Sequence, residues 1–232
     1  ISFFLFSKKR YRFKKQVNHK KQHKVSEVTK QIAGKVVQPS IKISPNQIFN
    51  DKKLKQIIKF KIKYKLIMIA PTANWIGKIW PSERYLELIN KLIKDPYFKR
   101  SLFIFVGPSS EKHYVKKILE LNNPYIFDLF GNSSLIEIFN IMKLCTLFIG
   151  NDSGLMHLAS LAKIKTIGLF GPSDKLKYKP WGKGNFSISS PKSPEELMGY
   201  RGFDSTNCGS LMLGLETQKV YKKIISKFKN TK

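Results

Sequence analysis

Acidic residues are scarce in this chain of 232 residues, which has 15 Asp and Glu against 43 Lys and Arg and a formal net charge of +28. Such a charge suits anionic partners, namely nucleic acids, anionic membrane surfaces or acidic substrates. Arginine is scarce as well, because 38 of the 43 basic residues are Lys. Base readers and tight phosphate clamps favour the rigid fork of Arg. The composition therefore argues against dedicated nucleic-acid binding. It indicates a solvated Lys-rich surface, with an anionic membrane surface as an alternative.

Cysteines and long apolar runs are also rare. Cys145 and Cys208 stand alone, without metal-ligand spacing or a disulfide framework, which fits a reducing cytosol and predicts no metal site. No apolar run approaches the roughly 20 residues of a membrane-spanning helix, and residues 1–6 are too short for a signal peptide. The hydrophobic content of 42% is enough for a core, so we expect a folded protein.

The first 65 residues are the most basic part, with a net charge of +17 from 19 Lys and Arg against two acidic residues. Residues 1–24 alternate aromatic and basic side chains, which could stack on bases, but we prefer a strand and loop at a domain edge. Residues 25–33 have helical spacing that Gly34 stops. Residues 51–65 form a basic amphipathic stretch. It could lie on a membrane, but more often such a stretch is a surface helix, and its inward residues here would be Leu54, Ile57 and Ile58.

From Leu66 onward, apolar strands alternate with helical segments. The predicted strands cover 66–71, 102–107, 125–128, 146–149, 166–170 and 186–189. The predicted helices cover 83–94 after a capping Ser82, 110–121, a stretch from Ser133 or Ser134 to Met142, 153–162 and 216–229. This alternation predicts an α/β fold in which helices cover both faces of a parallel sheet.

Small and polar residues lie at the ends of four of the predicted strands. They are Pro71-Thr72, Gly107-Pro108-Ser109-Ser110, Gly150-Asn151-Asp152-Ser153 and Gly171-Pro172-Ser173-Asp174. Ligands of open α/β sheets bind beyond the carboxyl ends of the strands. We therefore expect one site at this edge. The sequence has no Walker-type lysine loop, and no GxGxxG follows its first strand.

The strongest of these strand ends is Asp152-Ser153-Gly154-x-x-His157. Ser153 and Gly154 would offer backbone N–H groups to an anion at a helix N-terminus, where the helix dipole favours negative charge. His157 falls one turn later on the same face. Asp152 could contact a ligand, but it also stands where a helix N-cap belongs, and both roles remain open.

Two further segments offer candidate ligand contacts. In residues 71–81, Thr72 can donate its hydroxyl to a phosphate and Lys78 can neutralise a diphosphate, while Trp80 and Pro81 set the entry of the next helix. In residues 107–111, Glu111 could bind ribose hydroxyls, although stabilisation of the first helical turn explains it nearly as well.

These residues resemble the family 9 glycosyltransferases, the ADP-heptose:lipopolysaccharide heptosyltransferases. The family signature G-x-D-[ST]-G-x-x-H-x-A, followed by a strand and F-G-P-[ST]-D, is present over residues 150–174, and the upstream K-x-W-P is present over residues 78–81. Weaker similarity covers residues 208–220 and His23-Lys24-Val25, which is similar to an H-x-V near the end of the family's first domain.

The resemblance implies a GT-B fold, with two Rossmann-like domains facing across a cleft, and an ADP-heptose donor without a cofactor. It implies that Thr72, Lys78, Ser153 and Gly154 contact the diphosphate, that Asp152 binds hydroxyls of the sugar, and that His157 supports the phosphate side. The family inverts the anomeric centre with a carboxylate base near the start of its first domain. The acceptor would be the lipopolysaccharide inner core on lipid A.

The glycine-rich acceptor loop and the base carboxylate of the family have no counterpart here, so no catalytic residue is identified. We expect residues 1–65 to be the end of a truncated acceptor domain and residues 66–232 to be the nucleotide-sugar-binding domain. The expected location is cytoplasmic and peripheral, on the inner face of the cytoplasmic membrane. The alternatives are a non-catalytic nucleotide-sugar-binding fragment and a basic nucleic-acid-binding protein.

Overall fold

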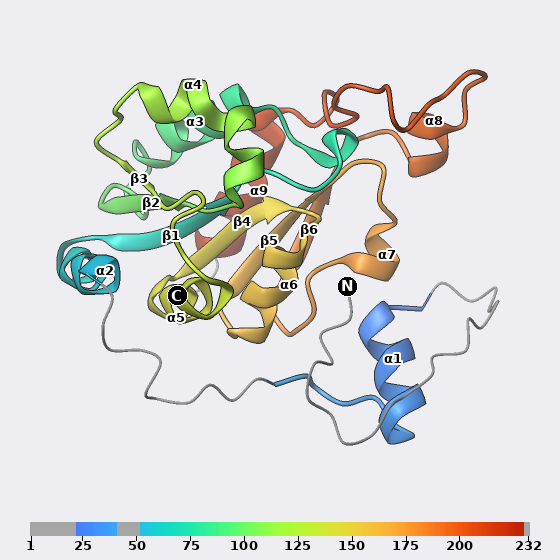
Figure 1. Cartoon of the computed structure of the whole chain (residues 1–232), viewed down its shortest axis with the longest axis horizontal. Coiled ribbons are helices and arrows are strands. Elements are labelled where there is room, and N and C mark those ends of the chain that lie inside the picture. Colours follow the sequence, from blue (N-terminus) through green and yellow to red (C-terminus); the bar gives the residue numbers. More distant parts are fainter. Residues whose placement is uncertain (1–21, 41–51, 230–232) are drawn as a thin grey trace.

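A six-stranded parallel sheet organises the computed structural model, which describes residues 22–40 and 52–229 (Figure 1). The strands lie in the order β3-β2-β1-β4-β5-β6, and every neighbouring pair is parallel. Their bounds are β1 Lys65–Ala70, β2 Ser101–Phe105, β3 Ile126–Asp128, β4 Leu147–Asn151, β5 Lys165–Phe170 and β6 Phe186–Ser189. The expected α/β class with a parallel sheet is confirmed, and all six predicted strands are present within one or two residues of their predicted ends.

Helices cover both faces of the sheet (Figure 1). The protein has two hydrophobic cores, one on each face of the sheet, and alternate residues of β1 belong to different cores. Ile67 and Ile69 pack with helices α3 and α9, whereas Leu66 and Met68 pack with α2, α5 and α6. The helices are α1 Lys24–Ala33, α2 Lys52–Lys63, α3 Ser82–Leu92, α4 Lys116–Glu120, α5 Leu135–Leu144, α6 Gly154–Leu161, α7 Lys175–Tyr178, α8 Pro194–Met198 and α9 Thr217–Lys229. Burial on both sides explains why the strands read as continuous apolar runs rather than alternating ones.

Helix ends follow local capping chemistry, with two departures from prediction. Ser134 starts α5 with a reciprocal capping box to Glu137, and Gly34 ends α1 with a left-handed φ of 69°. Ser82 does not cap α3, because it is already helical and Pro81 occupies the cap without a side-chain bond. Residues 110–121 are not one α-helix, since a 3-10 segment, η3 (Ser109–Val115), precedes the short α4.

The basic helix α2 is present as predicted but only partly in the predicted orientation. Ile57 is fully buried against the sheet. Ile58, expected to face inward, has 47% of its surface exposed, because adjacent residues of a helix point 100° apart. The side chain of Leu54 lies outside the described residues, as does the aromatic and basic stretch of residues 1–21.

The strand register brings the ends of β1 and β4 together. Ala70 is paired with Gly150, one residue before β4 ends. A Cβ added at Gly150 would lie 2.8 Å from the Ala70 carbonyl oxygen, so a side chain there would push the strands apart. The loops that leave β1 and β4, which carry Thr72 and Asp152, therefore start side by side.

Candidate functional site

The site lies where the strand order reverses. From β1 the chain moves to β2 and β3 on one side, and from β4 it moves to β5 and β6 on the other. Loops that diverge from two adjacent strands leave a crevice at their carboxyl ends, which is where open α/β sheets bind ligands. The segments at this crevice are 71–81 after β1 and 152–157 after β4.

An ion pair bridges the two segments. The Lys78 Nζ donates to Asp152 Oδ2 over 2.7 Å, although the residues are 74 positions apart in the chain. The Asp152 side chain is 7% exposed and that of Lys78 is 27% exposed. The crevice therefore holds a buried carboxylate next to a cation that still reaches solvent. Sequence reasoning proposed both residues and did not foresee their contact.

Asp152 is not the N-cap of the following helix, so the capping role that the sequence left open is excluded. Helix α6 begins at Gly154, with Ser153 in the cap position in extended conformation and with no side-chain bond. The Oγ of Ser153 is buried and unpartnered. A Cβ at Gly154 would meet nothing within 4 Å. Because the first N–H groups of a helix have no intrahelical acceptor, the start of α6 presents donors to open space.

His157 lies one turn into α6, half-buried, with its Nε2 4.0 Å from Asp152 Oδ1. Burial lowers the pKa of His157 below its ordinary value, and the charges of His23 and Lys78 lower it further, while the Asp152 carboxylate opposes them. The net direction favours a neutral imidazole near neutral pH. A neutral ring can donate one hydrogen bond and accept another.

Thr72 and Glu111 differ in how close they lie to this centre. Thr72 is buried, two residues beyond β1, and so borders the crevice directly. Glu111 lies on η3 after β2, one strand further along, and is half-buried. Among the described contacts, none joins Glu111 to Lys78 or Asp152.

Asn151, which the sequence presented only as part of the motif, holds the crevice together. Its side chain is fully buried at the end of β4. The Oδ1 accepts from the Trp80 N–H over 3.2 Å and from the Tyr85 hydroxyl over 3.0 Å, and the Nδ2 donates to the Pro71 carbonyl over 2.8 Å. The sequence did not reveal this role, because Asn151 stands between an apolar strand and a polar loop, where a polar residue is common.

The late segment of the chain braces the lysine loop. The Leu211 N–H donates to the Gly77 carbonyl over 3.1 Å, and the Ser210 hydroxyl donates to the Ile79 carbonyl over 2.6 Å. The ring of Trp75 packs so closely over Gly77 that a Cβ there would lie 2.6 Å from it. These contacts hold the backbone on both sides of Lys78. They explain in structural terms why residues 208–220 and the K-x-W-P element resemble the family together.

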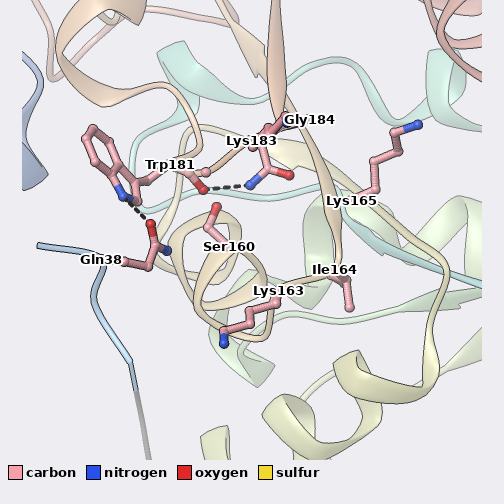
Figure 2. A pocket seen from close by; sticks show the side chains of 10 residues that line it. Gln38, Ser160, Lys163, Ile164, Lys165, Trp181, Lys183 and Gly184 are labelled. Atoms are coloured by element: carbon pink, nitrogen blue, oxygen red, sulfur yellow. Dashed lines mark hydrogen bonds between the residues drawn. The ribbon is translucent and has the colours of Figure 1, made fainter.

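The segment around α1 is anchored to Lys179 and Trp181, which follow α7. His23 caps α1 by accepting from the Val25 N–H at Nδ1, and its Nε2 bonds the Lys179 carbonyl over 2.8 Å. Figure 2 shows the second anchor, in which the Trp181 indole donates to Gln38 Oε1 over 2.7 Å. A cavity of about 460 Å³ lies beneath, at the amino ends of β5 and β6 and away from the crevice. The side chains of Lys163 and Lys165 point away from each other there (Figure 2).

Metal and membrane features are absent from the part of the chain that the structure describes. Within residues 22–40 and 52–229, no group of three or more His, Cys, Asp or Glu side chains could hold a metal ion. Over the same ranges, every helix is too short or too polar to cross a membrane.

A parallel α/β sheet with a lysine, a carboxylate and a helix N-terminus at its switch point has the features that anionic ligands of open α/β sheets use. The family model for glycosyltransferase family 9 (heptosyltransferase) matches residues 2–198, and the chain belongs to this family. The lipooligosaccharide heptosyltransferase 2 of Campylobacter jejuni is 27% identical over 198 residues, which are 81% of this chain and 59% of that protein. The lipopolysaccharide heptosyltransferase 3 of Escherichia coli is 30% identical over 122 residues, 52% of this chain and 35% of that one.

Solved structures show the same fold. The ADP-heptose lps heptosyltransferase II of Escherichia coli gives a TM-score of 0.63 at 19% identity, over 85% of this chain and 56% of that chain. A glycosyl transferase family 9 member from Veillonella parvula gives a TM-score of 0.71 at 18% identity, over 93% of this chain and 62% of that chain. The chain thus spans about three fifths of the length of these two structures and of the Campylobacter jejuni relative.

Proposed function

We propose that this chain is the donor-binding part of a glycosyltransferase that holds an ADP-activated heptose and transfers the sugar to the lipopolysaccharide inner core. Residues 66–232 would form the donor domain, and residues 1–65 would belong to the acceptor side and its linker. The observation that carries this proposal is the contact of Lys78 with Asp152 at the crevice between β1 and β4. Membership of family 9 and relatives named heptosyltransferases support the choice of donor and acceptor.

The diphosphate would lie between Lys78 and the start of α6. Lys78 supplies a compact cation, and the N–H groups at Ser153 and Gly154 supply fixed dipoles. The open space around Gly154 leaves room for phosphate oxygens, and Thr72 borders the same space. Glycosyl transfer releases the diphosphate with added negative charge, and preorganised donors stabilise that charge without rearranging.

Asp152 would bind hydroxyls of the sugar, with His157 on the phosphate side and Glu111 toward the ribose. In the free protein the Asp152 carboxylate is paired with Lys78, so donor binding would exchange this ion pair for two separate contacts. The sugar would then lie next to the phosphate cation, which places the bond to be broken between the two side chains. This arrangement needs no metal ion or other cofactor.

The acceptor sugar and the base that deprotonates it would come from the other side of the cleft. By likeness to the family, that base is a carboxylate and the anomeric centre is inverted. We propose a cytoplasmic location with peripheral binding to the inner face of the cytoplasmic membrane. There the Lys-rich surface meets anionic lipid and a phosphorylated lipid A.

Calorimetry with ADP and with ADP-heptose on wild type and Asp152→Ala tests the proposal. Removing the carboxylate frees Lys78, so ADP binding should be unchanged or tighter, whereas the added affinity from the sugar should disappear. Parallel losses for both ligands would contradict the sugar role. ADP-heptose binding without transfer, in the presence of acceptor, would indicate a nucleotide-sugar-binding fragment instead.

A further inference from the structure

Helix α2 exposes a stripe of apolar side chains among lysines. Its 12 residues contain six Lys and no Asp or Glu. Ile58 has 47% and Ile62 has 83% of its surface exposed. Residues four apart on a helix point within 40° of each other, so the two isoleucines form one stripe. An exposed Ile pair on a charged helix is not explained by the core of this protein.

The buried side of α2 fixes the direction of this stripe. Ile57 is fully buried, and the ring of Phe60 packs edge-on against Phe127 of β3 with centroids 5.5 Å apart. From these anchors, helical geometry puts exposed lysines on both sides of the isoleucines. They are Lys61 on one side and Lys55, Lys59 and Lys63 on the other.

We propose that this face of α2 docks on an anionic lipid bilayer. Ile58 and Ile62 would enter the boundary between headgroups and acyl chains, and the flanking lysines would contact lipid phosphates. The inference rests on the proposed membrane location and names the surface responsible for it. Basic residues beside apolar ones on an interfacial helix are the pattern that anionic lipid attracts.

Two other kinds of partner fit this face less well. The buried cores of protein interfaces are depleted in Lys, whereas here lysines border the apolar stripe on both sides. Single-stranded nucleic acids stack on aromatic rings and Arg planes, but the stripe consists of Ile, and α2 contains no Arg. Charge and chemistry together favour lipid.

The position of α2 leaves the crevice free. The helix directly precedes β1, at the amino end of the sheet (Figure 1). Lys78 and Asp152 follow β1 and β4 and lie beyond the carboxyl ends. A strand of six residues separates these two ends by about 20 Å. A chain docked through α2 would keep its crevice open to a soluble nucleotide sugar.

Co-sedimentation of the full chain with vesicles of phosphatidylglycerol and phosphatidylethanolamine tests the proposal, with phosphatidylcholine vesicles as the uncharged reference. Wild type should bind the anionic vesicles and bind the reference weakly. Changing Lys55, Lys59 and Lys63 to Gln should lower the affinity about a hundredfold. Ile58→Ser with Ile62→Ser should lower it about tenfold.

Matched variants separate α2 from the overall charge. Changing Lys94, Lys222 and Lys223 to Gln removes the same charge near the opposite face of the sheet, where all three are exposed. Leu121→Ser removes another apolar side chain that is 60% exposed. Both controls should bind vesicles within about threefold of wild type, because surface charges act over about one Debye length. An equal loss in the lysine control would overturn the assignment to α2.

Two further readouts make failure specific. The α2 variants should bind ADP as wild type does, because α2 is remote from the crevice. All variants should unfold at the same urea concentration, because the substituted side chains are exposed. Unchanged vesicle binding by the α2 variants would overturn the lipid surface but not the proposed function. The same holds if the α2 variants change self-association or RNA binding instead of vesicle binding. Absent ADP binding by wild type would count against the proposed function and not against the lipid surface.

Discussion

Lys78 and Asp152 meet at 2.7 Å across the two loops that diverge from the centre of the sheet. The pair is asymmetric, since the carboxylate is 7% exposed and the lysine side chain 27%. A partly exposed ammonium can exchange a protein partner for a ligand at small cost, whereas a buried carboxylate needs a partner at all times. The pair is therefore suited to a site that binds and releases a charged ligand.

This asymmetry predicts unequal effects on stability. Lys78→Ala leaves the Asp152 charge buried without its cation and should lower the free energy of unfolding by about 2 kcal/mol, while Asp152→Asn should lower it by about 1 kcal/mol because Lys78 can turn to water. Urea unfolding measures both. Lys112→Ala is the matched control, since Lys112 pairs with Asp128 at the same 2.7 Å but both side chains are more exposed. It should change stability by about 0.5 kcal/mol or less.

The titration of His157 reports the charges around it. Asp152→Asn removes the charge that raises the His157 pKa, so this pKa should fall further below its ordinary value. Lys78→Met removes a charge that lowers it, so the pKa should rise. NMR titration of the ring protons measures both shifts. A higher pKa in Asp152→Asn would contradict the described arrangement.

The same lowered pKa predicts how stability depends on pH. Between the ordinary His value of about 6.5 and the lower native value, the unfolded chain binds a proton at His157 that the native protein does not. The free energy of unfolding should therefore fall as the pH drops through this window. His157→Gln removes this contribution, so its unfolding midpoint in urea should fall less than that of wild type between about pH 7.5 and about pH 5.5. Equal losses would show that His157 is not responsible.

Asn151 should be the residue at the crevice whose loss costs most stability. Asn151→Ala leaves a buried N–H, a hydroxyl and a carbonyl without partners and should lower the free energy of unfolding by about 3 kcal/mol or more. Asn123→Ala is the control, because Asn123 makes one exposed bond to the Tyr125 N–H, and its loss should cost about 1 kcal/mol or less. Calorimetric or urea unfolding distinguishes the two, and similar losses would show that Asn151 does not hold the loops together.

The two cysteines should differ sharply in reactivity. Burial raises the pKa of Cys145 to about 12, and its thiol donates to the Ile141 carbonyl. Cys208 is half-buried in the loop before α9. Because the thiolate is the reactive form, iodoacetamide should modify Cys208 in the native protein and spare Cys145 until unfolding. Mass spectrometry of the modified peptides measures this, and early labelling of Cys145 would contradict its described burial.

Periodicity and strand-end chemistry predicted the parallel sheet and the edge that carries the candidate site. Apolar runs such as Leu66–Ala70 form strands that are buried on both faces, and an uninterrupted apolar run in the sequence predicts such a strand. Contacts between distant segments were not visible. The sequence placed Lys78 and Asp152 at one site but did not predict their direct contact, nor that of Asn151 with Trp80. The strand order β2-β1-β4 that brings their loops together is a property of the whole fold.

The orientation of surface features was also beyond the sequence. A basic amphipathic pattern predicted α2, but which of its isoleucines faces the core depends on packing against β3 and α5. Ile57 and Ile58 are equally apolar, and only one is buried. Likewise, the position of Asp152 in the sequence is compatible with a helix N-cap. In the structure Ser153 takes the cap position, and the Asp152 carboxylate contacts Lys78 instead.

Titration calorimetry of ADP with wild type, Lys78→Ala and Lys112→Ala tests the central claim most directly. We expect wild type to bind ADP at one site, Lys78→Ala to bind at least about tenfold more weakly, and Lys112→Ala to bind as wild type does. The expected loss reflects one charge-assisted contact to the diphosphate. An affinity for ADP that is the same in all three proteins, or no binding by wild type, would contradict a diphosphate site at the crevice between β1 and β4.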